Sequence, residues 1–224
     1  MLKRIALICL FLTFGICGAF YYYWSQFTKI PQWYSEAEES ALPTDAPTTQ
    51  ANKQQVQSKI ASQIQPQIGN GEVEVKLNPE DVNELLVANI ARNKKGSALL
   101  QTTKGVKTTI RDDSVEIGAV LNTAELSQQE AKIEQAIAKF PLLKNRDIYV
   151  AVEGQPTAIN GQLQFDENTL IKVGNLSMTV TETAQRLGVS PDKLLCNLTV
   201  KSELIQVQDI KFGDEEIIFK GNRN

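Results

Sequence analysis

Histidine is absent from this 224-residue chain, and cysteine occurs only three times. Without histidine there is no Ser–His or Cys–His nucleophile pair, and the commonest metal ligand is missing. Cys9 and Cys17 lie in the first apolar run, so Cys196 is the single thiol beyond it. One thiol makes neither an intradomain disulfide nor a structural zinc site. The composition predicts a non-enzymatic body with no catalytic, cofactor or metal site.

An excess of basic charge is also missing. The net charge is -3, and all 26 acidic residues follow Trp24. Nucleic-acid binding favours a concentrated basic face, so no nucleic-acid partner is expected. Once an apolar segment and a linker are set aside, roughly 150 residues remain, which is enough for one domain with its own core.

The long apolar run is what the chain does have. Ile5–Trp24 contains no charged residue, and at about 1.5 Å per residue it matches a hydrocarbon core of about 30 Å. A secretory signal has a shorter apolar region, of about 7–15 residues. The run closes with Tyr21, Tyr22, Tyr23 and Trp24, and such rings favour the headgroup layer. We expect a retained transmembrane helix over 5–24 with these four interface anchors; a cleaved signal is the alternative.

Flanking charges predict the orientation of this helix. Lys3 and Arg4 precede the run, whereas acidic residues dominate the stretch after it. Positive charge near a membrane segment favours the cytoplasmic side. We therefore expect residues 1–4 in the cytoplasm and a single-pass protein whose large domain lies on the outer side of the membrane, periplasmic or extracellular.

Two segments separate the apolar run from the body. Residues 25–50 include SEAEESALPTDAPTTQ, a composition typical of an extended linker. In 51–70, Val56, Ile60 and Ile64 recur every fourth residue. This spacing gives a narrow apolar stripe and predicts a Gln-rich helix docked on the body, followed by a connector.

The body, 71–224, opens with strict alternation. GEVEVKL predicts a strand over 71–77. Asn-Pro-Glu-Asp is a helix start, and the apolar spacing after it predicts a helix over 79–90. VKTTIRDDSVEIGAVLN predicts a hairpin over 106–121 with its turn at Asp-Asp.

Later segments complete the fold class. A helix is expected over 124–139, with Ser127 and Glu130 spaced as a capping box. From residue 147 onward short strands dominate, interrupted by a helix at about 182–187. Short connections favour antiparallel pairing. The predicted class is α+β: an N-terminal transmembrane helix, then one domain with a curved antiparallel sheet and packed helices.

Two motifs suggest a specific activity. Ser190 and Lys193 match the S-x-x-K spacing of Ser-Lys hydrolases, but the supporting S-D-N and K-T-G elements are absent. A helix start with Ser190 as cap and Pro191 at its first position explains them better. Gly188 and its neighbours fit the turn of a helix-turn-helix. Because basic residues are few there, we interpret this as local mimicry; a peptidoglycan-binding LysM motif lacks its usual opening.

Two acidic pairs and one thiol remain. Asp112-Asp113 and Asp166-Glu167 could bind a cation or act as an acid/base pair. Each pair falls in an expected turn, where aspartate bonds to the backbone. Cys196 is expected at a strand start as a small buried residue, with a redox role as the alternative.

Three stretches taken together resemble a family. KLNPEDVNELLVANIA, IKVGNLSMTV and LIQVQDIKFGDEEIIFKG are similar to segments of bacterial membrane-anchored YpmS-like proteins, which are distantly related in architecture to the tubular lipid-binding (TULIP) superfamily. The resemblance implies a long curved sheet that wraps a helix and leaves an apolar groove for an acyl chain. It supplies no catalytic residues.

The expected function rests on the apolar run and this resemblance. We expect a non-enzymatic module of the cell envelope, anchored in the membrane, that binds a lipid or another apolar ligand. One alternative is a scaffold or assembly protein that binds another envelope protein through its sheet edge or Gln-rich helix. A Ser-Lys hydrolase is the second. The expected groove is lined by Val82, Leu85, Leu86, Ile90, Val115 and Ile117.

Overall fold

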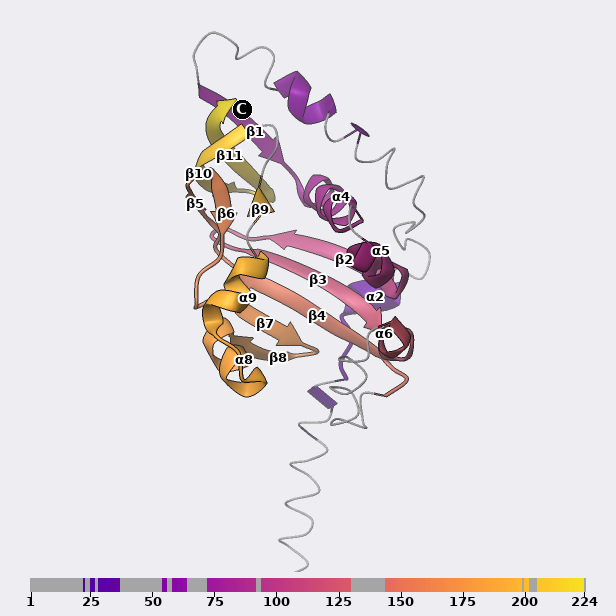
Figure 1. Cartoon of the computed structure of the whole chain (residues 1–224). Helices are drawn as coiled ribbons and strands as arrows, with labels where there is room; N and C mark the ends of the chain where they lie inside the picture. The colour runs from indigo at the N-terminus through magenta and orange to yellow at the C-terminus, as the bar shows by residue number, and fades with distance from the viewer. Residues whose placement is uncertain are drawn as a thin grey trace, which may run out of the picture.

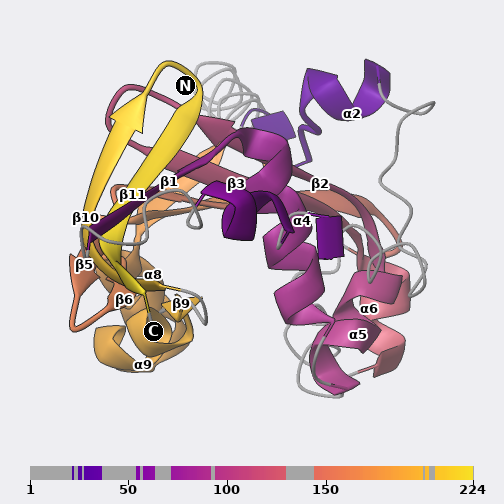
Figure 2. The same ribbon diagram turned by 90° about the horizontal axis from the view of Figure 1, so that it is seen from above.

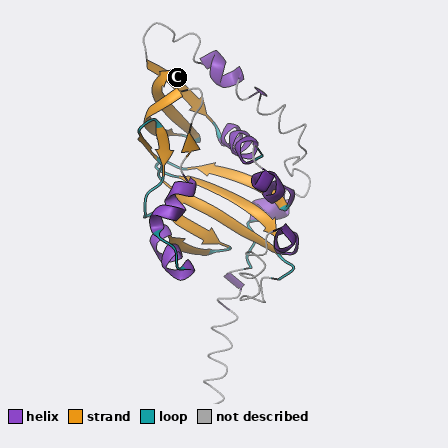
Figure 3. Ribbon diagram, viewed as in Figure 1, coloured by secondary structure: helices purple, strands orange, loops and turns teal. Residues whose placement is uncertain are grey.

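The computed structural model is an α+β protein with antiparallel sheets and several helices (Figures 1 and 3), which confirms the predicted class. Within the described part of the chain no helix is long and apolar enough to cross a membrane. The predicted membrane segment, 5–24, lies outside the described residues except for Tyr22. The structure describes residues 22, 25–26, 28–36, 54–55, 58–63, 72–91, 94–129, 144–198, 200–201 and 205–223.

The first sheet joins the two ends of the body. Its order is β1-β11-β10, and both pairs are antiparallel. The alternation that predicted the first strand is confirmed, because Val73, Val75 and Leu77 are all buried. A bulge lies between Val207 and Asp209 of β10. The strands are β1 (Glu72–Leu77), β10 (Ile205–Gly213) and β11 (Glu216–Arg223).

The second sheet is the largest and has the order β2-β3-β4-β7-β8. Every neighbouring pair in it is antiparallel. The predicted hairpin is confirmed: Ile110 pairs with Val115, and the turn between them holds Asp112 and Asp113. Its strands are β2 (Thr103–Ile110), β3 (Val115–Asn122), β4 (Asp147–Gly154), β7 (Leu170–Val173) and β8 (Leu176–Thr179).

A third, small sheet corrects the expectation of a single curved sheet. After Gly154 the chain leaves the second sheet, forms a short hairpin and returns only at Leu170. That hairpin pairs with β9 instead, and an isolated bridge from Gly161 to Val207 links it to the first sheet. The strands are β5 (Thr157–Ile159), β6 (Gln162–Gln164) and β9 (Val200–Lys201).

Helix α4 (Pro79–Ile90) forms where it was predicted. Two reciprocal hydrogen bonds cap its start. The Asp81 N–H donates to Asn78 Oδ1 at 2.8 Å, and the Asn78 N–H donates to Asp81 Oδ2 at 3.1 Å. The helix packs on β2, where Thr108 donates to the buried Asn83 side chain at 2.7 Å. The following helix, α5 (Lys94–Gln101), was not predicted.

The predicted capping box of the next helix is wrong. Helix α6 (Thr123–Gln129) begins before Ser127. The cap is Asn122, whose side-chain oxygen accepts from the N–H groups of Ala124 and Glu125 at 3.1 and 3.2 Å. Ser127 lies inside the helix and donates to the Thr123 carbonyl at 2.6 Å. The rest of the predicted helix, through Lys139, lies outside the described residues.

Two short helices follow β8 and pack against each other across a turn. Helix α8 (Val180–Leu187) carries a complete capping box between Thr179 and Glu182 and ends at Gly188, whose φ is 69°. Helix α9 (Pro191–Leu198) starts where the Ser-Pro pair predicted a helix start. Cys196 is therefore exposed on a helix, and its predicted place at a strand start is wrong.

The main core lies between the first sheet, β2 and β3. It includes Ile110, Val115 and Phe219, and Ile60 from the described helical residues 58–63 packs into it. Gln63 in the same segment bonds to the backbone N–H of Lys76 at 2.7 Å. The predicted docking residues Val56 and Ile64 lie outside the described residues.

A second cluster involves residues within the predicted linker range. Helix α2 (Gln32–Glu36) falls within 25–50, yet Ile30, Trp33 and Tyr34 pack against Val120 and Tyr149 of the second sheet. Figure 2 shows α2 on one side of this sheet and α4, α5 and α6 on the other. Three large apolar side chains thus pack on the sheet despite the polar composition of their surroundings.

Candidate functional site

One face of the second sheet carries two apolar rows that cross all five strands. The first row pairs Val106, Ala119, Val150, Val173 and Leu176 in register. The second pairs Thr108, Ile117, Val152, Ile171 and Met178 in the same way. With strands about 4.8 Å apart, each row is about 19 Å long. We call these two rows the apolar face.

The apolar side chains of this face are only half-buried. Every member of the first row lies between the buried and exposed classes, and so does every member of the second except the buried Thr108. Such side chains normally supply a core. Because the nine apolar members keep part of their side chains accessible to solvent, we treat this continuous area as a candidate binding surface.

The opposite face of the same strands is packed far more closely. Val120 is 0% exposed, Ala151 2% and Tyr149 6%, because Ile30, Trp33 and Tyr34 cover them. Of the two faces, the more apolar one is the less covered.

Helices border the apolar face at both edges of the sheet. At the β2 edge Asn83 of α4 bonds to Thr108. At the β8 edge Val180 of α8 is fully buried, and its N–H donates to the Thr169 carbonyl at 2.9 Å. Figure 2 shows α4–α6 and α8–α9 as two separate groups on this side of the sheet. The rows on β3, β4 and β7 lie between these two groups.

The structure brings four of the six residues predicted to line a groove together at the main core. Val115 belongs to it, and Val82, Leu85 and Ile117 pack against it half-buried. Leu86 and Ile90 are half-buried on α4. Only Ile117 belongs to the apolar face. That these six residues line a groove stays a prediction.

The residues of β4, β7 and β8 on this face were not predicted from the sequence. Their signal was present, because DIYVAVEG places Val150 and Val152 on one side and LIKV places Ile171 and Val173 likewise. What the pattern lacks is information on how much of each face is covered.

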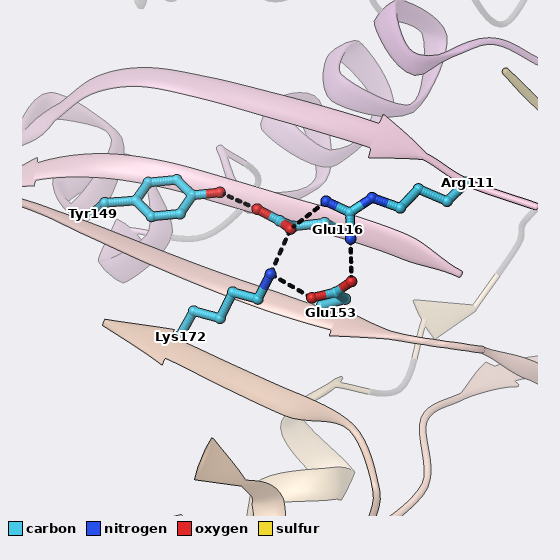
Figure 4. Close-up of polar contacts among 5 residues, drawn as sticks. All are labelled: Arg111, Glu116, Tyr149, Glu153 and Lys172. Atoms are coloured by element: carbon cyan, nitrogen blue, oxygen red, sulfur yellow. Dashed lines mark hydrogen bonds and ion pairs between the residues drawn. The ribbon is translucent and has the colours of Figure 1, made fainter. Parts of the chain in front are cut away.

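Charged side chains gather on the closely packed face, beside Tyr149 (Figure 4). Glu116 accepts from Tyr149 Oη at 2.6 Å and pairs with Lys172 Nζ at 2.7 Å and Arg111 Nη2 at 3.3 Å. Lys172 and Arg111 both pair with Glu153 as well. Two cations thus bridge two carboxylates across β3, β4 and β7.

Mutual pairing sets the ionisation of this cluster. Burial raises the pKa of Glu116, but the hydrogen bonds from Lys172 and Tyr149 outweigh it, and the net pKa lies below its usual value. Burial lowers the pKa of Lys172, yet its two carboxylate partners raise it overall. Burial and the Glu116 carboxylate raise the pKa of Tyr149. Glu116 stays ionised and Lys172 stays protonated at neutral pH, so Glu116 is not a proton donor and Lys172 is not a nucleophilic amine.

The remaining candidate residues lie apart from one another. Ser190 and Lys193 are both exposed at the start of α9, joined by a backbone bond of 3.2 Å. Asp166 accepts from the N–H groups of Asn168 and Thr169 at 3.0 and 3.1 Å, a local turn as predicted. Across the described ranges no cluster of three or more metal-ligand side chains occurs.

Comparison of the chain with protein-family models, with curated proteins and with solved structures returned no match.

Proposed function

We propose that this chain is a non-enzymatic envelope protein, anchored by its apolar run, whose body binds a lipid or similar apolar ligand on the apolar face. The observation that carries the proposal is the pair of in-register apolar rows left half-covered while the other face is packed.

Ligand chemistry follows from the shape and polarity of this surface. Nine of its ten side chains are apolar and come from all five strands. A surface about 19 Å long and two rows wide suits an extended acyl chain better than a compact polar molecule. The resemblance to YpmS-like and TULIP-like proteins supports the same class of ligand.

Residues 25–224 retain the α2 segment that packs on the sheet, so they form the appropriate soluble protein for a binding test. We expect a bound lipid in native mass spectra of this protein, and enhanced fluorescence of a dansyl-labelled fatty acid. Protein that is free of lipid and leaves the probe unchanged would refute the proposal.

A matched pair of substitutions locates the ligand. Ala119→Trp places a large ring in the middle of the first row and is expected to weaken probe binding at least tenfold, because it occupies the same space. Ser177→Trp puts the same ring on an exposed position of the opposite face of β8, and binding should persist. Equal loss in both variants would place the ligand elsewhere.

A protein-binding scaffold is the second candidate. Ile159 lies on β5, an edge strand of the third sheet, and is 46% exposed. An exposed apolar side chain on a sheet edge favours pairing with another chain. Photo-crosslinking from position 159 in intact membranes should then yield one abundant protein adduct, whereas a lipid binder should not.

A further inference from the structure

The segment just after the apolar run is bonded directly to the turn between β7 and β8. The Asn175 N–H donates to the Gln26 carbonyl at 2.8 Å, and the Asn175 side chain donates to Gln26 Oε1 at 3.0 Å. This pair joins residues that are 149 positions apart. A segment that only tethered the body would make no such contacts.

The contact continues from Gln26 along the sheet. Trp33 packs edge-on against Tyr149, with ring centroids 6.2 Å apart, and Lys107 Nζ lies 5.8 Å from the Trp33 ring centroid. Gly105 makes room for it, since a Cβ there would already touch the Trp33 ring at 3.4 Å. The segment 25–36 is therefore held along the sheet rather than at a single point.

Chain length then limits how far this sheet can lie from the apolar run. Ser25 alone separates Trp24 from Gln26. Two residues span at most about 7 Å, and each headgroup layer is about 6 Å thick. Gln26 and its partner Asn175 thus fall within or beside the headgroup layer once the run is embedded.

We propose that the membrane surface is a docking partner of the body: the Gly174–Asn175 turn rests at the headgroup layer, and the 25–36 segment fixes the orientation of the sheet. This rests on the proposed function, in which the apolar run stays in the bilayer. The proposed orientation also identifies the source of the ligand. Val173 and Leu176 of the first apolar row flank this turn, so the apolar face begins at the membrane, and the ligand class is a lipid of that same bilayer.

A depth measurement on the full chain tests this geometry. Cys9→Ala, Cys17→Ala and Cys196→Ser remove the native thiols, and a nitrobenzoxadiazole dye is attached at Ser177→Cys or at Asp214→Cys. Position 177 is next to the turn, whereas position 214 lies in the β10–β11 hairpin of the first sheet, which Figure 1 draws apart from β7 and β8. In phosphatidylcholine vesicles with headgroup-nitroxide lipid, we expect several-fold stronger quenching at 177 than at 214.

Two insertions of twenty Gly/Ser residues provide the matched control. Placed between Trp24 and Ser25, the insert adds a reach of about 25 Å, and quenching at 177 should fall to the level at 214. Placed between Pro43 and Thr44, it lies behind the docked segment, so quenching should not change. Equal effects of the two insertions, or equal quenching at 177 and 214 without an insert, would overturn the inference.

Co-sedimentation with the vesicles separates this inference from the proposal that it rests on. A chain that remains in the supernatant refutes the membrane anchor and the inference together. A chain that sediments but shows equal quenching refutes the orientation alone and leaves lipid binding to its own test.

Discussion

The Tyr149 ring lies directly over Gly118. A Cβ at this position would be 2.1 Å from Tyr149 Oη and 2.5 Å from its Cζ. The ring therefore reaches Glu116 only because position 118 carries no side chain. Gly118→Ala must displace the ring, and we expect a loss of about 2 kcal/mol in the free energy of unfolding.

A double-mutant cycle tests that explanation of Gly118. Urea unfolding of Gly118→Ala, Tyr149→Leu and the combined variant gives the coupling between the two positions. We expect Gly118→Ala to cost little once the ring is gone. An undiminished cost in the Tyr149→Leu background would show that the glycine is required for the backbone instead.

Glu116 makes the stability of the body depend on acid pH. Its pKa is lower in the folded chain than the ordinary 4.5, so folding favours the ionised form. This contribution is fully present above the ordinary pKa and is lost as the pH falls through the folded value. Near pH 7 we expect Glu116→Gln to lower the free energy of unfolding by about 2 kcal/mol.

The pH dependence of the Glu116→Gln effect is the decisive measurement. Urea unfolding between pH 7 and pH 3 should show the difference from the native chain shrinking below about 4.5, where the native carboxyl becomes protonated in the unfolded state. Glu167→Gln, in an exposed turn, serves as the matched control and should show little difference throughout. A constant penalty across the range would contradict the linkage.

Helix α8 has a cap at each end: a capping box at its start and a left-handed glycine at its end. The Thr179 hydroxyl accepts from the Glu182 N–H at 3.1 Å, and the Thr179 N–H donates to the Glu182 carboxylate at 2.9 Å. Thr179→Ala should cost about 1 kcal/mol in the free energy of unfolding, whereas Thr181→Ala, at an exposed position in the first turn, should cost close to nothing. Equal effects in denaturant titrations would mean that the box contributes nothing beyond helix propensity.

Local patterns predicted the elements that local physics determines. Strict alternation gave β1 and the β2–β3 hairpin, and the helix-start residues gave α4. The start of α6 was predicted to within one residue, but its cap was not, because two caps were available: Ser127 with Glu130 by spacing, and Asn122, which the end of β3 brings into place. α5 was missed because KKGSALLQ is short, carries a glycine in its first turn and has only three apolar residues.

Arrangement between elements was not predictable in the same way. Both faces of β4 are sufficiently apolar to be buried, with Val150 and Val152 on one side and Tyr149 and Ala151 on the other. Which side is covered depends on Trp33, more than 110 residues earlier in a polar region. Alternation identifies the faces of a strand but not their neighbours, so the half-covered apolar face became apparent only in the assembled sheet.

At the scale of the whole molecule, residues 25–36 complete the body rather than leading up to it. A chain that begins at residue 37 lacks the aromatic cover of Val120 and Ala151. We expect its free energy of unfolding to be about 3 kcal/mol lower than that of a chain that begins at residue 25. This difference corresponds to a Tm lower by about 10 °C. Both chains lack the apolar run, so calorimetry compares only the docked segment.

Adding residues 25–36 back as a separate peptide tests whether their packing on the sheet accounts for the difference in stability. A synthetic peptide of residues 25–36 should raise the Tm of the shorter chain in proportion to its concentration, because it binds the folded state alone. The same peptide with Trp33→Ala should not, since the Trp33 contact with Tyr149 supplies much of the buried area. Equal Tm values for the two chains would place residues 25–36 outside the cooperative unit, and the body would then hang from the apolar run without a fixed orientation.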